Sequence, residues 1–338
     1  MDMEQEELQF LGFFAICKEA ITITFCRFKI FMKLTLTLIL PLSIVFLAHD
    51  GFSTFLSQTI LKNEDTLEAT QVGTPTFNDE NNKISSEFAT LWVIKLVYLT
   101  FSLVFSLLST SAVVYTVACI YTGKEITYKK IMSVVPKVWK RVMVTFLWNF
   151  GIMFAYNMLF VLIIVIITII FLNQYNQITL TGALLTLITL ILYLIGFVYM
   201  SVIWQIASVI SVMEDTYGIQ AMAKSQRLIK GKMGISVAIF LVFFLCLVGI
   251  QISFEKIQVT ERSSIGIFGR IGYGILSLVA LTLLFLFGYV VQTIVYFVCK
   301  SYHHQNIDKS SLADHLEAYR GEYVPLTSNN IQMEQFDV

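Results

Sequence analysis

The residues of this sequence that could bind a metal ion gather near its end. Three of the four histidines are His303, His304 and His315, and Asp308 and Asp314 lie among them. Imidazole and carboxylate groups bind zinc, but zinc sites place their ligands at a few recurring spacings that this stretch does not match. We therefore expect a solvated segment beside the membrane here, and no metal site.

The cysteines offer a second kind of chemistry, either disulfide formation or lipid attachment. The five are Cys17, Cys26, Cys119, Cys246 and Cys299. None lies in a predicted non-cytoplasmic loop, so we expect no disulfide. All but Cys246 lie near the predicted cytoplasmic membrane face, where S-palmitoylation is possible, although free cysteines are more often small buried residues. The sequence also lacks a His-Glu-x-x-His motif, a phosphate-binding glycine-rich loop and a nucleophile elbow, so we predict neither an enzyme nor a bound cofactor.

Polar side chains inside long apolar stretches are the default sign of a functional site in a membrane protein. Here they are almost all uncharged, and Lys95 near the end of its stretch is the exception. The uncharged ones are Asn149, Asn157, Gln205, Gln251 and Gln292. Interhelical hydrogen bonding is one interpretation, and the lining of a cavity for a carried molecule or lipid is the other. Proton-coupled transport is disfavoured because these stretches hold no acidic residue.

The most distinctive polar segment lies between Trp204 and Lys232. An apolar run ends at Glu214, a turn is allowed by Gly218, and a basic amphipathic helix follows. We expect Glu214 to pair with Lys224 or Arg227. The candidate interaction residues are Glu214, Lys224, Ser225, Arg227, Lys230 and Lys232. One interpretation is a connector whose basic side meets anionic lipid head groups. The other is a recognition surface for a cytosolic protein or a phospholipid head group.

Residues 301–338 form a polar tail of mixed charge, which we expect to be cytoplasmic and partly disordered. Within this tail, Tyr323 and Leu326 fit the Tyr-x-x-apolar pattern of a sorting signal. The pattern is short and arises often by chance, so it marks a candidate sorting motif only.

Composition identifies the class of protein that must position these groups. Hydrophobic residues make up 57% of the 338 residues and charged residues 14%, whereas soluble domains carry about 25% charged residues. The apolar residues come in blocks such as 161–172 and 238–250, which form the cores of stretches long enough to cross a membrane as helices. The net charge is zero, with 23 basic and 23 acidic residues, so no nucleic-acid partner is expected. We predict an all-α, polytopic membrane helix bundle.

Six transmembrane helices are predicted within residues 31–300. They are placed at Phe31–Ala48, Leu91–Tyr121, Val142–Leu172, Ile178–Met213, Ile235–Ser253 and Ile271–Lys300. Pro41 is expected to kink the first span. The fourth span is long enough for either one helix or a helix with a re-entrant piece.

Loop charges predict the orientation, because Lys and Arg concentrate on the cytoplasmic side of membrane proteins. The segments before span 1, after span 2 and after span 4 are basic, and the loop at 49–90 is acidic. Both termini are therefore expected in the cytoplasm. Residues 1–30 would form an N-terminal segment with an interfacial helix, and 49–90 a mobile, non-cytoplasmic polar loop.

A weak internal repeat also appears in the sequence. Three basic amphipathic stretches each lead into a predicted pair of spans, at Lys18–Lys33, Tyr128–Arg141 and Ala221–Lys232. Their spacing suits helices that lie at the membrane surface. We predict three hairpins, each preceded by an interfacial helix on the cytoplasmic side, although the units are unequally spaced and a shared topological constraint would produce the same pattern.

The segment from Glu214 to Lys232, the N-terminal sequences LQFLGFFAICKEA and LTLILPLSIVFLAH, and the tail sequence GEYVPL resemble a plant family of uncharacterised six-span transmembrane proteins. A looser form of the Glu214 to Lys232 pattern is similar to the membrane domain attached to some bacterial glycerophosphodiester phosphodiesterases. That domain is not the catalytic part. The resemblance implies a shared fold and a non-enzymatic membrane role, and it implies no substrate.

These observations lead to two functional hypotheses. The first is a non-catalytic protein of the endomembrane system or plasma membrane, which scaffolds, sorts or regulates partners through its cytoplasmic face. Its partners would be membrane lipids, with anionic head groups among them, and a cytosolic or membrane protein. The second is a facilitated carrier or lipid-handling protein, in which Asn149, Asn157, Gln205 and Gln292 face a cavity.

Overall fold

The computed structural model describes residues 9–68, 75–123, 126–171, 179–257 and 266–303. These residues are almost entirely helical, and no β-strand occurs among them. Six of the helices are long and apolar enough to cross a membrane. The predicted all-α bundle with six spans is therefore confirmed, and the chain is an integral, multi-pass membrane protein.

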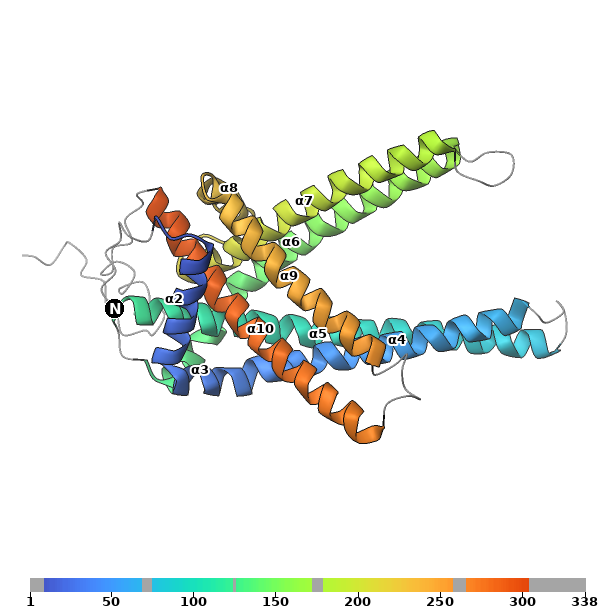
Figure 1. Cartoon of the computed structure of the whole chain (residues 1–338), viewed down its shortest axis with the longest axis horizontal. Coiled ribbons are helices and arrows are strands. Elements are labelled where there is room, and N and C mark those ends of the chain that lie inside the picture. Colours follow the sequence, from blue (N-terminus) through green and yellow to red (C-terminus); the bar gives the residue numbers. More distant parts are fainter. Residues whose placement is uncertain (1–8, 69–74, 124–125, 172–178, 258–265, 304–338) are drawn as a thin grey trace, which may run out of the picture.

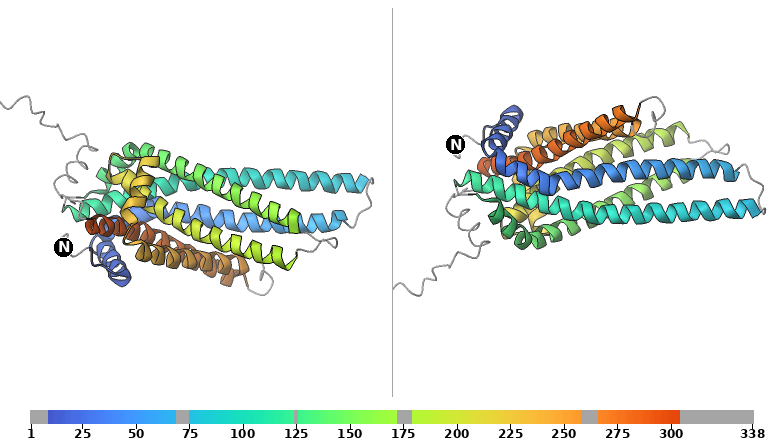
Figure 2. Two further views of the ribbon diagram at one scale, coloured as in Figure 1. Left: turned by 90° about the horizontal axis from the view of Figure 1, so that it is seen from above. Right: turned by 90° about the horizontal axis from the view of Figure 1, so that it is seen from below.

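The helices follow one another along the chain with short connections. They are α2 (Phe13–Cys26), α3 (Phe28–Leu34), the π-helical turn η1 (Thr35–Ile39), α4 (Leu40–Glu68), α5 (Pro75–Tyr121), α6 (Tyr128–Phe171), α7 (Leu180–Met213), α8 (Ile219–Ile229), α9 (Met233–Glu255) and α10 (Ile267–Tyr302). Helices α4 and α5, α6 and α7, and α9 and α10 form three hairpins (Figure 1). The α6–α7 hairpin diverges from the α4–α5 hairpin along its length, and α9 and α10 cross the side of the bundle (Figures 1 and 2).

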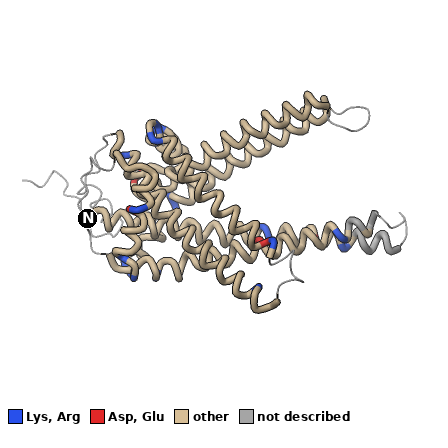
Figure 3. The backbone as a smooth tube through the Cα atoms, viewed as in Figure 1, with Lys and Arg blue, Asp and Glu red and all other residues tan. Residues whose placement is uncertain are grey.

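The buried core lies at one end of the bundle, where α2, α3, α8 and the first turns of α6 gather. We call this the basic end, because Lys and Arg residues concentrate there (Figure 3). Buried apolar residues from α2, α5, α6, α7, α8 and α10 form a continuous cluster in this region. At the other end, the α6–α7 hairpin carries no charged residue and exposes large side chains such as Ile169 and Leu180. Such faces suit contact with lipid chains.

The predicted loop at 49–90 is wrong for the residues described, because α4 and α5 extend into it from both sides. The two helices pack on each other beyond the apolar stretches. Ile60 and Ile84 are buried between them, and the Asn63 side chain donates hydrogen bonds of 3.0 and 2.9 Å to the two carboxylate oxygens of Glu87. The outward-facing polar residues made the segment resemble a loop, whereas the inward-facing apolar residues pack the two helices against each other.

Of the three predicted interfacial helices, Ala221–Lys232 contains most of the separate helix α8, whereas Lys18–Lys33 is divided at Arg27 between α2 and α3. The third stretch, Tyr128–Arg141, is instead the continuous first part of α6. Its residues Val134, Val135 and Val138 are buried in the bundle, so the helix continues into the span without a break. Pro136 lies inside this helix and does not end it.

The backbone also shows the local structure of the first and fourth spans. The turn η1 ends at Ile39, two residues before Pro41, and π-helical turns and prolines are both recognised causes of helix bending. The fourth span is one helix, α7, which begins after Thr179, whose hydroxyl accepts a hydrogen bond of 3.3 Å from the Gly182 N–H.

Candidate functional site

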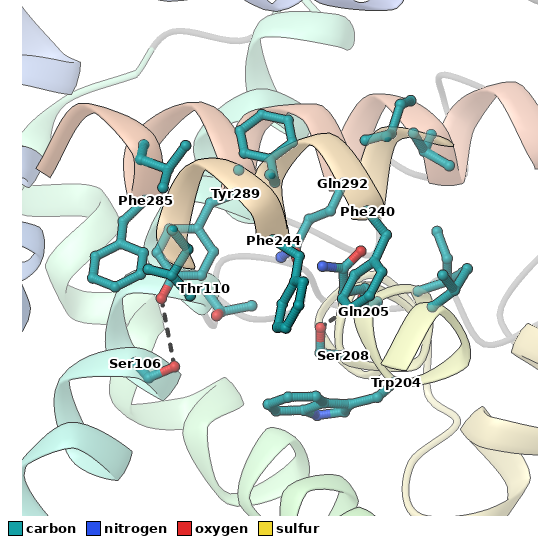
Figure 4. Close-up of a pocket in the computed structure, with 18 of the residues that line it drawn as sticks. Ser106, Thr110, Trp204, Gln205, Ser208, Phe240, Phe244, Phe285, Tyr289 and Gln292 are labelled. Carbon is teal, nitrogen blue, oxygen red and sulfur yellow. Dashed lines mark hydrogen bonds between the residues drawn. The ribbon is translucent and has the colours of Figure 1, made fainter. Parts of the chain in front are cut away.

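A cavity of about 440 Å³ lies inside the bundle, and all six spanning helices contribute to its wall. This volume falls within the range of small-molecule sites, roughly 300–1,000 Å³. Much of the wall is aromatic, and Figure 4 shows these rings around the open space. The aromatic residues include Phe46, Phe146, Trp204, Phe240, Phe244 and Phe285.

Polar groups also converge on this cavity. They are hydroxyls and amides, supplied by Ser102, Ser106, Thr110, Gln205, Ser208, Ser236, Tyr289 and Gln292. The hydroxyls of Ser106 and Tyr289 lie 3.4 Å apart, and the Ser208 hydroxyl donates to the Gln205 main-chain oxygen at 2.7 Å. A mostly apolar wall with a few polar groups is the usual composition of a ligand site.

Two side-chain amides, those of Gln205 and Gln292, also line the cavity. Gln205 comes from α7 and Gln292 from α10, and both amides point into the cavity (Figure 4). The Nε2 atom of Gln292 is buried and has no hydrogen-bond partner among the described residues. Because a buried amide without a partner costs free energy, this group is suited to bind a polar atom of an occupant.

The other interior polar residues predicted from the sequence do not line the cavity. Asn157 accepts a hydrogen bond of 2.8 Å from the Tyr193 hydroxyl and donates one of 2.7 Å to the Met153 oxygen. It therefore joins α6 to α7, as interhelical hydrogen bonding predicts. Asn149 is buried, and its Oδ1 atom has no partner within the described part of the chain. The sequence thus identified two cavity residues, Gln205 and Gln292, among its candidates.

Glu214 lies at the centre of a charged cluster at the basic end. Its carboxylate accepts a hydrogen bond of 2.8 Å from the Tyr296 hydroxyl, and it pairs with Lys300 at 3.3 Å and with Lys224 at 2.5 Å. Burial alone raises the pKa of Glu214, but the hydrogen bonds from Lys224 and Tyr296 and the charge of Lys300 outweigh it. The pKa therefore lies below its usual value. The predicted pair with Lys224 is confirmed, and the cluster ties α8 and α10 to the end of α7.

The predicted interaction segment is only partly exposed. Ser225 is fully buried, and its hydroxyl donates a 2.8 Å hydrogen bond to the Ile203 oxygen of α7. Lys232 lies over the Tyr302 ring, with its Nζ atom 5.2 Å from the ring centre. Arg227 and Lys230 are exposed. The segment therefore uses Glu214, Lys224 and Ser225 for internal packing and presents Arg227 and Lys230 outward.

The turn that connects α7 to α8 depends on Gly218. This residue has φ +65°, and its N–H donates a 2.7 Å hydrogen bond to the Thr145 hydroxyl, which also bonds Ser211 at 2.7 Å. A Cβ atom at this position would approach the Trp148 ring to 3.2 Å. Glycine is therefore required here both by the backbone conformation and by the space available.

Several residues of these sites gave no usable signal in the sequence. Tyr296 and Lys300 lie far from Glu214 along the chain, and an apolar span hides the position of Tyr296. His49 and Asp50 were assigned to a loop, but they lie within α4, where the His49 ring stacks on Tyr98 with 3.8 Å between ring centres. This contact could not be predicted from local sequence, because Tyr98 lies on the neighbouring helix α5.

The remaining predicted groups either lie outside the described residues or form ordinary contacts. Tyr323 and Leu326 of the candidate sorting motif lie outside them, as do the tail residues from His304 onward. The Nε2 atom of His303 lies 3.0 Å from the Leu228 oxygen and 2.9 Å from the Lys230 oxygen. Because carbonyls only accept, this nitrogen carries a proton. No group of three potential metal ligands occurs in the ranges that the structure describes.

Fold and site together define a polytopic helical membrane protein with a cavity inside its spanning bundle. The chain belongs to the family described as "Domain of unknown function (DUF8558)", which matches residues 1–336. No curated protein and no solved structure matches the chain.

Proposed function

We propose that this protein handles membrane lipids, and that it binds one lipid-like molecule in the cavity between its six spans. The observation that carries the proposal is the unpartnered Gln292 amide in an aromatic wall. Aromatic and aliphatic side chains suit an apolar body, and the amides of Gln205 and Gln292 suit one polar end. The role is non-catalytic.

The divergence of the α6–α7 hairpin supports exchange of the occupant with the bilayer. The residues of this hairpin that line the cavity lie toward the basic end, and further along its length the hairpin diverges from the α4–α5 hairpin (Figure 1). Its exposed apolar side chains match lipid chains rather than protein. A molecule already dissolved in the bilayer can therefore approach the bundle from the side.

Trp204 provides a direct test, because its indole ring lines the cavity. We would purify a variant in which Trp92, Trp139 and Trp148 are Phe, and titrate it with a lysolipid whose acyl chain carries two bromine atoms, which quench tryptophan. Saturable quenching of Trp204 is expected. Its absence would overturn the proposal.

Two matched glycine variants separate cavity binding from general lipid contact. Gly288 lines the cavity, and a Cβ atom added to it would lie 3.8 Å from the Phe243 ring. Gly288→Leu therefore places a larger side chain in the cavity and should abolish saturable quenching. Gly249 meets no atom within 4 Å and lines no part of the cavity, so Gly249→Leu should leave quenching unchanged.

A scaffolding role remains the second candidate, and it is favoured by the exposed cations of the basic end. Arg227 of α8 and Lys230, which directly follows α8, are exposed, as are Lys129 and Lys140 of α6. By the positive-inside rule this end faces the cytoplasm, which would place the N-terminus there, in the endomembrane system or plasma membrane. Charge reversal of Arg227 and Lys230 should then abolish binding to vesicles with anionic lipids or to a co-purifying protein, and unchanged binding would refute it. The plant origin and the kinship to the phosphodiesterase membrane domain stay predictions.

A further inference from the structure

Among the described residues, those that line the cavity carry no charged side chain. Its 25 lining residues include no Asp, Glu, Lys, Arg or His, and Tyr289 is neutral near pH 7. Along α10, the charged residue nearest to Gln292 is Lys300, which is already paired with Glu214. An ionised group that enters the cavity would therefore lose its water without gaining a counter-charge, which is among the most costly of transfers.

The two amides in the cavity wall match one particular chemistry. An amide offers both a donor and an acceptor, and Gln205 and Gln292 provide two such groups on opposing helices. A hydroxyl group likewise donates one hydrogen bond and accepts others, so it can bond to both kinds of amide atom. A phosphate offers acceptors only and carries charge that nothing here offsets.

We propose that the occupant is an uncharged lipid whose polar end carries hydroxyl groups, of the acylglycerol kind, and that Gln205 and Gln292 bind those hydroxyls. This inference rests on the proposed lipid-handling function and names the class of ligand. The aromatic wall around Phe244 and Phe285 holds the apolar body of the lipid. The protein therefore discriminates against phospholipids at this site, although they surround it.

The test compares two ligands that differ only in a phosphate. These are a 1-acylglycerol and the corresponding 1-acylglycerol 3-phosphate, each with the same dibrominated chain. A fatty acid would be a weaker comparison, because a carboxylate can bind after protonation. Both ligands are titrated into the variant that keeps Trp204 alone, in non-ionic detergent. A variant that keeps only Trp148, which is 50% exposed on α6, reports quenching outside the cavity.

We expect saturable quenching of Trp204 by the acylglycerol, with an affinity at least tenfold above that of the phosphate. Gln205→Leu and Gln292→Leu should each weaken acylglycerol binding about five- to tenfold, as the loss of one hydrogen bond predicts. Gln292→Lys should reduce the difference in affinity between the two ligands, because its ammonium group supplies the missing counter-charge to the phosphate. Retained intrinsic fluorescence and monodispersity verify that each variant is folded.

Two outcomes would overturn the inference, and they differ in what else they overturn. Equal quenching by both ligands would refute discrimination by charge and leave the lipid-handling function intact. Quenching of Trp204 that never exceeds that of Trp148, with either ligand, would refute the proposed function as well.

Discussion

Glu214→Gln should destabilise the bundle far more than Asp215→Asn, although the two residues are adjacent. Each substitution removes one negative charge and keeps the shape of the side chain. The Glu214 side chain is 14% exposed and bonds to three groups on two other helices. The Asp215 side chain is 72% exposed and pairs with Arg141 at 2.6 Å. The two substitutions therefore make the same chemical change, and they differ in the burial and the partners of the side chain.

The expected magnitude follows from burial and from the number of cationic partners. Removing one member of a buried ion pair costs about 3–5 kcal/mol, because it leaves the other charges uncompensated. Lys224 and Lys300 remain partly exposed, at 31% and 19%, so water offsets part of this loss. We expect a loss of about 2–4 kcal/mol for Glu214→Gln. An exposed pair such as that of Asp215 contributes about 0–1 kcal/mol.

The assay is reversible unfolding in mixed micelles, followed by tryptophan fluorescence as the denaturing detergent fraction rises. Measurement at several pH values adds an independent check. Because the pKa of Glu214 is lower in the folded state than its usual 4.5, its stabilisation is complete above about pH 4.5 and is lost as pH falls through the lowered value. The difference in free energy of unfolding between wild type and Glu214→Gln should therefore shrink as the pH falls.

Equal losses for the two variants near pH 7 would refute the reasoning. They would mean that the cluster around Glu214 is as well hydrated as the exposed pair. A gap that persists unchanged at low pH would show that the charge of Glu214 is not what stabilises the cluster.

The turn between α7 and α8 allows two further predictions by the same unfolding assay. Gly218→Ala should lower the free energy of unfolding by about 1–3 kcal/mol, because a φ of +65° is strained for a residue with a Cβ atom and because that atom meets Trp148. The control is Gly234→Ala, where an added Cβ meets nothing within 4 Å, and it should cause no measurable loss. Thr145→Val should cost about 1–3 kcal/mol, because the buried Gly218 N–H and the Ser211 hydroxyl both lose a partner, and a change below 0.5 kcal/mol would contradict this.

Much of the fold could be predicted from local sequence. The number of spans follows from the apolar stretches, because each must satisfy its own backbone hydrogen bonds within a helix in lipid. The basic end follows from the distribution of Lys and Arg. The pair of Glu214 with Lys224 could be anticipated because an acidic residue at the end of one helix precedes a short basic helix.

Other features could not be read from local pattern. The polar segment at 49–90 resembles a loop because hydropathy averages over both helix faces, whereas Ile60 and Ile84 occupy only the inner one. Ser225 looks like a surface residue on a basic helix, but α8 turns it toward the Ile203 oxygen. In both cases, the orientation of a face depends on which helix packs against it.

By itself, the sequence determined that this is a six-span helical membrane protein with one basic end, because chain length, hydropathy and charge are local quantities that lipid and water act on directly. Only the tertiary structure decided that Gln205 and Gln292 face a common cavity, while Asn157 bonds across its own hairpin. The sequence treats these amides as equivalent. Whether an interior amide bonds to protein or faces a cavity depends on which helices pack around it, and that is set by packing between residues far apart in the chain.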